Sequence, residues 1–166
     1  MTKILLTSFA TWMSYQTSNS SDDLLEKISA FTNINAELIY LRKLPVNTQI
    51  ASETVIEKIN QFHPDFVICC GMAESRNILT LEHQAREKDD LLITKMNLKK
   101  IIDNLSFTKI SYEAGQFVCE GLYYHVLKHI QTQKLNIDCV FLHVPVITPD
   151  NLDLILTDVR LFLNQL

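Results

Sequence analysis

The sequence predicts an α/β protein in which a mainly parallel mixed sheet carries helices on both faces. Strand-like and helix-like segments alternate from the first residues onward, which is the rhythm of parallel βαβ units. The third expected strand, residues 65–71, is a continuous apolar run after Asp65, the pattern of a strand buried on both faces. Apolar residues make up 47% of the chain and charged residues 20%, a globular composition. At 166 residues, one domain over 1–166 can bury a sufficient core.

The first half of the chain shows the alternation most clearly. Asp22 and Asp23 suit the positive end of a helix, Asn47 can cap the next helix, and Pro64 ends it. A loop rich in Ser, Thr and Asn separates the first strand from the first helix. The expected elements are a strand over 3–9, a helix over 22–31, a strand over 36–42, a helix over 47–62 and a strand over 65–71.

The second half adds an extended segment and a long helix. In residues 78–82 alternation puts Ile78, Thr80 and Glu82 on one face, with Glu82 at the tip. The further elements expected are a charged turn over 86–90, a short helix over 98–105, a strand over 108–112, a helix over 116–134, a strand over 139–145 and a last helix capped by Asp150.

A cysteine stands where a nucleophile would be favoured. Gly115 predicts a turn that leads directly into a helix, so Cys119 falls close to the helix N-terminus. The macrodipole and the free N–H groups there favour a thiolate, which predicts a pKa below that of a free thiol. His143 lies 24 residues further on, near the end of a buried strand. A Cys, a His and a carboxylate brought together would form a hydrolase triad.

Structural roles for these residues stay open at this point. Cys119 falls within the apolar stripe of its helix, and free cysteines are often core residues. His143 would then be a hydrogen-bonded core histidine, and Glu82 a solvated strand end. His125 and His129 have the spacing of metal ligands on a helix, but no further motif completes a site, so we expect them to face water and expect no metal.

Composition excludes several classes of function. The net charge is −4 and Lys and Arg are scattered, so nucleic acid is not an expected partner. The four cysteines lack CxxC spacing, which argues against a zinc site or a disulfide framework. The first apolar run is too short for a signal peptide or a membrane span. We therefore expect a cytoplasmic protein with no membrane partner.

Several motifs together resemble one known family. They are Ile4 to Phe9, Leu44-Pro45-Val46, His63-Pro64-Asp65 through Gly71-Met72-Ala73-Glu74-Ser75-Arg76, Leu81-Glu82, Ala114-Gly115 through Cys119, and Leu142-His143-Val144-Pro145. Their order and contexts are similar to those of pyroglutamyl peptidase type I.

The resemblance implies a three-layer α/β/α sandwich, no cofactor, and a Cys–His–Glu triad that removes N-terminal pyroglutamate from a small peptide or amide. The triad would be Cys119 as nucleophile, His143 as base and Glu82 as the orienting carboxylate. The residues expected to bind substrate are Phe9, Trp12, Met72, Arg76 and Val118.

The chain also departs from the family pattern. The first loop lacks the family's glycine pair and proline, although Trp12 keeps an aromatic there, and Glu74-Ser75 replaces the Gly-Gly or Pro-Gly before the arginine. Glu120 follows the cysteine where Asn is usual, and the segment between Glu82 and Cys119 is shorter and lacks an Ile-Pro-Asp-Asn stretch. We expect Glu120 to face solvent.

Three functions therefore stay open. They are release of pyroglutamate, hydrolysis of another small acyl or amide group by the same mechanism, and a silent relative used for binding or assembly, possible homo-oligomers included. Arg76 could bind a substrate carboxylate or fix its loop through backbone carbonyls, and the sequence favours neither.

Overall fold

The computed structural model describes all residues from Met1 to Leu166. The predicted alternation of strands and helices is confirmed. The elements are β1 (Thr2–Phe9), α1 (Ser20–Ile28), β2 (Ala36–Leu44), α2 (Thr48–Phe62), β3 (Phe66–Met72), β4 (Leu79–Glu82), β5 (Gln84–Glu87), β6 (Asp90–Ile93), α3 (Leu98–Ile102), β7 (Thr108–Ser111), α4 (Val118–Thr132), β8 (Asp138–Val144) and α5 (Leu152–Leu163).

Six strands form one mixed sheet in the order β2-β1-β3-β8-β4-β7. The four strands from β2 to β8 are parallel, β4 is antiparallel to β8, and β7 is parallel to β4. The prediction of a mainly parallel mixed sheet is confirmed. Because β1, β3 and β8 are parallel, their carboxyl ends lie at one edge, where open α/β sheets place their sites.

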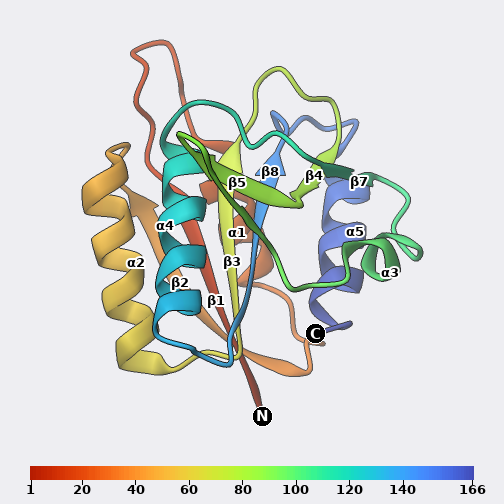
Figure 1. Cartoon of the computed structure of the whole chain (residues 1–166). Helices are drawn as coiled ribbons and strands as arrows, with labels where there is room; N and C mark the ends of the chain where they lie inside the picture. Colours follow the sequence, from red (N-terminus) through yellow and green to blue (C-terminus); the bar gives the residue numbers. More distant parts are fainter.

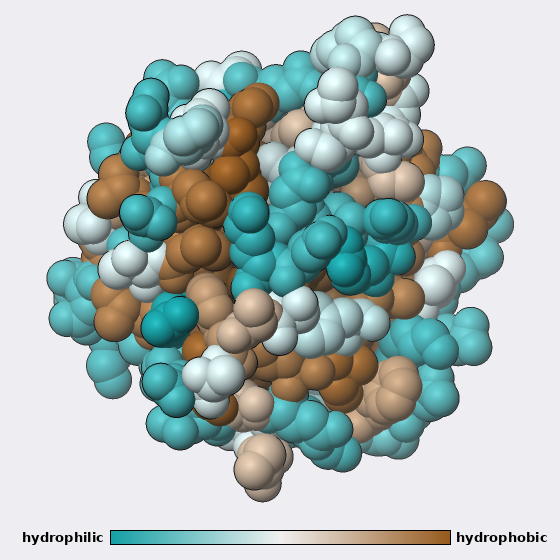
Figure 2. Space-filling view, turned by 180° about the vertical axis from the view of Figure 1, so that it is seen from behind, coloured by the Kyte–Doolittle hydropathy of each residue, from teal (hydrophilic) through white to brown (hydrophobic).

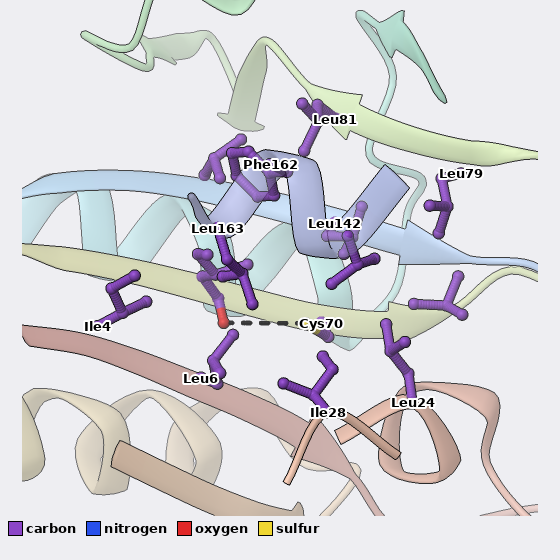
Figure 3. Close-up of a cluster of buried hydrophobic side chains, with 14 of the residues drawn as sticks. Ile4, Leu6, Leu24, Ile28, Cys70, Leu79, Leu81, Leu142, Phe162 and Leu163 are labelled. Atoms are coloured by element: carbon purple, nitrogen blue, oxygen red, sulfur yellow. Dashed lines mark hydrogen bonds between the residues drawn. The ribbon is translucent and has the colours of Figure 1, made fainter. Parts of the chain in front are cut away.

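Helices cover both faces of this sheet (Figure 1). On the face toward the viewer, α2 and α4 pack against each other and against the strands, while α1 and α5 lie on the far face. Each face has its own cluster of 19 buried apolar residues. Figure 3 shows the cluster on the far face, where Ile4 and Leu6 of β1 meet Leu24 and Ile28 of α1 and Phe162 of α5. A sheet with helices and a buried apolar cluster on each of its faces is an α/β/α sandwich.

A two-stranded hairpin replaces the bare charged turn predicted over 86–90. Strands β5 and β6 flank the turn, and Lys88 there takes a left-handed conformation with φ 54°. The prediction missed the strands because each is only four residues long, and their buried residues, Ala85 and Leu92, belong to the core on the α4 side. The hairpin is held to α4 by Tyr124 and Lys128, which both bind Asp90.

The helix caps confirm one prediction and correct another. The Asn47 side chain accepts a hydrogen bond from the Ile50 N–H and caps α2 as predicted. The cap predicted at Asp150 is wrong, because Asn151 precedes α5 and makes no side-chain cap hydrogen bond. The Asn151 carboxamide instead accepts from the Thr148 N–H and so closes the turn before the helix.

Helix α1 begins earlier than predicted. Its cap is Asn19, whose side chain accepts from the Ser21 N–H, so the helix starts at Ser20 rather than at Asp22. Asp22 is buried, accepts a hydrogen bond from Ser8 and forms a bidentate ion pair with Arg42. The acidic residue in the first turn therefore links three elements in addition to favouring the helix dipole.

The far face of the molecule keeps some apolar surface. Figure 2 shows it from behind, with apolar side chains interrupted by hydrophilic ones. Leu154 and Leu161 of α5 are among the large apolar residues left exposed in the structure. No helix combines the length and hydropathy that crossing a membrane requires. Homo-oligomer formation stays a prediction.

We expect Asp158→Ala to lower the free energy of unfolding by about 3 kcal/mol. The Asp158 carboxylate is buried and accepts from the Ser106 and Phe107 N–H groups and from the Thr108 hydroxyl, so its loss leaves three donors without their partner, of which the Thr108 hydroxyl is buried. Urea unfolding measures the change. Asp153→Ala, on an exposed position of the same helix, is the matched control and should cost about 0.5 kcal/mol. A loss below 1 kcal/mol at Asp158 would contradict this account.

Candidate active site

Cys119 is the second residue of α4. The chain turns at Gly115, whose φ of +96° is a conformation that favours glycine, and the helix then begins at Val118. Phe117 occupies the N-cap position and has no side-chain acceptor for the helix N–H groups. The first N–H groups of α4 therefore keep their donor capacity next to the cysteine. The predicted position of Cys119 near a helix N-terminus is confirmed.

Gly71 makes room for the Cys119 thiol above the sheet. A Cβ atom on Gly71 would lie 2.7 Å from the Cys119 Sγ and 2.7 Å from the Phe141 ring, closer than real side chains approach. Gly71 of β3 is the register partner of His143 on β8. Neighbouring strands lie about 4.8 Å apart, so the thiol packs on the strand beside the histidine. The structure has no hydrogen bond between Cys119 and His143.

His143 is bound to Glu82. The imidazole Nδ1 lies 2.7 Å from the Glu82 Oε1, and both side chains are buried. The contact depends on β4 running antiparallel beside β8, since Thr80 is then the register partner of His143 and Glu82 points to the same face two residues on. Glu82 is completely buried, so its interpretation as a solvated strand end is wrong.

Arg76 supports the same carboxylate. Its Nη1 donates to the Glu82 Oε1 and to the Thr80 hydroxyl, and its Nη2 donates to the Glu113 backbone carbonyl at 2.7 Å. The sequence left open whether Arg76 binds a substrate carboxylate or fixes the backbone through carbonyl groups. The contact with the Glu113 carbonyl shows that Arg76 fixes the backbone. The second Glu82 oxygen, Oε2, is buried without a partner. All hydrogen bonds to the Glu82 carboxylate are therefore accepted by one of its two oxygens, Oε1.

The environment sets the charges of this pair. Burial alone would raise the pKa of Glu82, but the hydrogen bond from His143 and the guanidinium charge of Arg76 outweigh it and hold the pKa below its usual value. Burial lowers the pKa of His143, although the Glu82 carboxylate opposes the shift. Near neutral pH the site holds a neutral imidazole on an ionised carboxylate.

The Cys119 thiol differs from its prediction. Burial raises the pKa of Cys119 to about 12, and Cys69 and the Glu82 charge add to the effect. Arg76 and the Cys119 backbone N–H act in the opposite direction but do not outweigh it. The predicted pKa below that of a free thiol is wrong, because the enclosure of the sulfur has a larger effect than the helix N-terminus. Cys119 is therefore a protonated thiol in the resting protein.

One cavity of about 700 Å³ gathers the predicted residues. Phe9, Trp12, Met72, Arg76, Val118, Cys119 and His143 all line it, whereas Glu82 lies buried next to His143 and does not. Sequence reasoning missed several lining residues, among them Gln16, Asn19, Val46, Thr48, Glu74 and Phe117. Val46, Glu74 and Phe117 stand inside motifs that the sequence analysis singled out, so their place could have been found. Nothing in the sequence linked Gln16 to Glu74.

Three further side chains of α4 make contacts that the sequence analysis did not predict. Glu120 is half-buried and accepts a hydrogen bond from the Arg86 N–H, so the expectation that it faces solvent is wrong, and burial raises its pKa. His125 lies 3.3 Å from Glu87, and His129 contacts Asn60. The structure contains no group of three or more residues placed to hold a metal ion.

A cysteine at a helix N-terminus and a carboxylate-bound histidine at one cavity are the arrangement of thiol-dependent hydrolases. The family model for pyroglutamyl peptidase matches residues 2–108 and 93–158. A pyrrolidone-carboxylate peptidase from Brachyspira hyodysenteriae is 30% identical over 151 residues, which cover 75% of each chain. One from Bacillus subtilis is 26% identical over 91% of this chain and 81% of its own. The chain belongs to the pyroglutamyl peptidase family.

Solved structures show the same fold. Pyroglutamyl peptidase I from Bacillus amyloliquefaciens superposes with a TM-score of 0.86 at 21% identity, over 99% of this chain and 96% of that one. Pyrrolidone carboxyl peptidase from Thermococcus litoralis superposes with a TM-score of 0.82 at 22% identity, over 98% and 91%. The shorter segment between Glu82 and Cys119 has not changed the architecture.

We expect iodoacetamide to label Cys119 ever faster up to pH 10. With a pKa raised to about 12, the thiolate fraction grows about tenfold per pH unit across pH 7 to 10. Mass spectrometry of quenched samples measures the rate, and free cysteine, which levels off near its pKa of about 8.5, is the reference. Cys69, Cys70 and Cys139 are buried and should stay unlabelled while the protein is folded. A Cys119 rate that levels off below pH 9 would contradict the effect of burial.

Proposed function

We propose that this protein is a cysteine peptidase that removes N-terminal pyroglutamate from peptides. Cys119 is the nucleophile, His143 the general base and Glu82 the carboxylate that orients the imidazole. The observation that carries the proposal is the 2.7 Å contact between His143 Nδ1 and Glu82. His143 lies on β8, and the Cys119 thiol packs against Gly71 on the neighbouring strand β3. Membership of the pyroglutamyl peptidase family supports it.

Attack begins with proton transfer, because the thiol is protonated at rest. The Cys119 sulfur bonds to the pyroglutamyl carbonyl carbon while His143 Nε2 accepts the thiol proton. The Glu82 carboxylate stabilises the imidazolium that forms, through its hydrogen bond to Nδ1. The N–H groups at the start of α4, including that of Cys119, can donate to the oxyanion.

The leaving amine then departs with a proton from His143. The carbon–nitrogen bond breaks as the imidazolium protonates the nitrogen, which leaves a thioester on Cys119. A water molecule attacks the thioester carbonyl while His143 Nε2 takes its proton. Collapse of this second intermediate releases pyroglutamate and returns the proton to the sulfur, so the chain ends in its starting state.

The cavity wall suits a small uncharged ring. Pyroglutamate has no ammonium group, since its amine is closed into a lactam. Phe9, Trp12, Met72 and Val118 line the cavity with apolar and aromatic surface on which such a ring can pack. A free N-terminal amine would lose hydration against these four side chains, none of which carries a charge to replace it.

A second candidate is a thiol amidohydrolase of the same mechanism that acts on another small acyl group. The observation that favours it is Glu74, which places a carboxylate in the cavity lining where the family pattern has glycine or proline. For location we propose the cytoplasm, because all four cysteines are free and a reducing compartment keeps them so.

We expect the protein to hydrolyse pyroglutamyl arylamides and Cys119→Ala to abolish the reaction. Release of the arylamine, followed by absorbance, measures the rate, and prior alkylation of Cys119 should stop it as well. Prolyl arylamide, which keeps the ring but has no lactam carbonyl, is the control and should turn over far more slowly. Hydrolysis that survives Cys119→Ala would place the chemistry elsewhere. Reactive Cys119 without any turnover would favour the second candidate.

We expect Glu82→Gln to lower kcat/KM by a factor of about 10² to 10⁴, because an amide cannot stabilise the imidazolium. In the wild type the reaction needs neutral His143, so the rate is lost as pH falls through the histidine pKa, which burial places below the usual 6.5. The pH profile of kcat/KM measures this. Glu113→Gln is the matched control, because Arg76 binds only the backbone carbonyl of Glu113. An acid limb centred above pH 7 would contradict the assignment.

A further inference from the structure

We propose that Glu74 and the aromatic side chains around it form a subsite for a cationic side chain on the residue that follows pyroglutamate. Substrates with lysine or arginine there would be preferred. This inference rests on the proposed function and adds to it a choice among peptides. It draws on residues in which the chain departs from its family, in the first loop and after β3.

Glu74 is held in place from two sides. Its Oε1 accepts from the Gln16 Nε2 at 2.7 Å, and its Oε2 accepts from the Tyr15 hydroxyl at 3.1 Å. All three residues line the same cavity as Cys119. Each carboxylate oxygen retains a further lone pair, so a cationic group can bind without displacing these donors.

The charge of Glu74 is the uncompensated one in the cavity. Tyr15 and Cys119 also line the cavity, but their pKa values are raised and both are uncharged near pH 7, which leaves Arg76 and His143 as the other residues that could carry a charge. Arg76 is ion-paired with the buried Glu82, and burial lowers the pKa of His143 so that it is neutral near pH 7. A substrate therefore meets a net negative wall, which attracts a cation and repels a carboxylate.

Aromatic rings line the same cavity as this carboxylate. Trp12, Tyr15 and Phe117 are exposed by 55%, 65% and 75%. The Trp12 and Phe117 ring centroids lie 6.3 Å apart. The long aliphatic stems of Lys and Arg pack on such rings, and their cationic heads are attracted to ring faces. Rings together with a fixed carboxylate match an ammonium or guanidinium group.

The cavity has room for more than the first residue. Its volume of about 700 Å³ lies well within the range that holds a drug-sized ligand, and a single lactam ring fills only a part of it. The residue after the cleaved bond must therefore lie in or at the mouth of the same space. A purely structural role for Glu74, fixing the first loop, would give no preference for charge.

The test compares three substrates that differ at one side chain: the amides of pyroglutamyl-lysine, pyroglutamyl-Nε-acetyl-lysine and pyroglutamyl-glutamate. Chromatography of released pyroglutamate gives kcat/KM for each. We expect kcat/KM for the lysine substrate to be about fivefold higher than for its acetylated form, a difference that an exposed ion pair can supply. The difference from the glutamate substrate should be larger. In 0.5 M NaCl the preference should shrink, because salt screens exposed charges.

Glu74→Gln separates charge from structure, since glutamine can still accept from Gln16 and donate to Tyr15. We expect it to reduce the lysine preference to less than twofold. Glu37→Gln removes the same charge from an exposed position at the start of β2, at the other end of the sheet, and should keep the preference. Equal rates on all three substrates, or a preference that survives Glu74→Gln, would overturn the subsite alone. Release from none of them would overturn the proposed function together with it.

Discussion

The buried carboxylate of Glu82 is the constraint on which the site depends. An ionised carboxylate removed from water is costly unless donors and a positive charge replace its hydration. Arg76 and His143 supply both, and they come from the loop after β3 and from β8. Arg76 also holds the Glu113 carbonyl, shortly before the turn that leads into α4. Satisfying this one charge therefore aligns the sheet edge, the loop and the approach to the cysteine.

Local signals in the sequence were sufficient for most of the fold. Alternation of apolar runs, Asn47 as a cap and Pro64 as a stop each act over a few residues, and the structure agrees with them. The failures concern what local patterns do not contain. Asp150 has the chemistry of a cap, but Asn151 stands one residue later and its carboxamide closes the preceding turn. The strands of the hairpin are recognisable only once α4 is there to cover Ala85 and Leu92.

The site divides in the same way. Cys119 and His143 could be placed because each lies near the end of an element whose type the sequence predicts. The burial of Glu82 could not be predicted, because it follows from the pairing of β4 with β8. That pairing brings Glu82 to His143, which lies 61 residues further along the chain. The pKa of Cys119 was predicted in the wrong direction for a related reason. A helix N-terminus is a local feature, whereas the desolvation that raises the pKa comes from the folded surroundings.

A protonated thiol beside a neutral imidazole also fits a nucleophile that becomes reactive only with substrate bound. A permanent thiolate would be open to oxidation and alkylation whenever the cavity stood empty. In the proposed mechanism the proton would leave the sulfur only when the carbon–sulfur bond can form, and the developing charge would pass to an oxyanion next to the N–H groups of α4. The imidazolium would form at the same moment, beside a carboxylate that is already ionised and already fixed by Arg76. The enclosure that lowers the reactivity of the resting thiol would thus also strengthen each electrostatic interaction in the transition state.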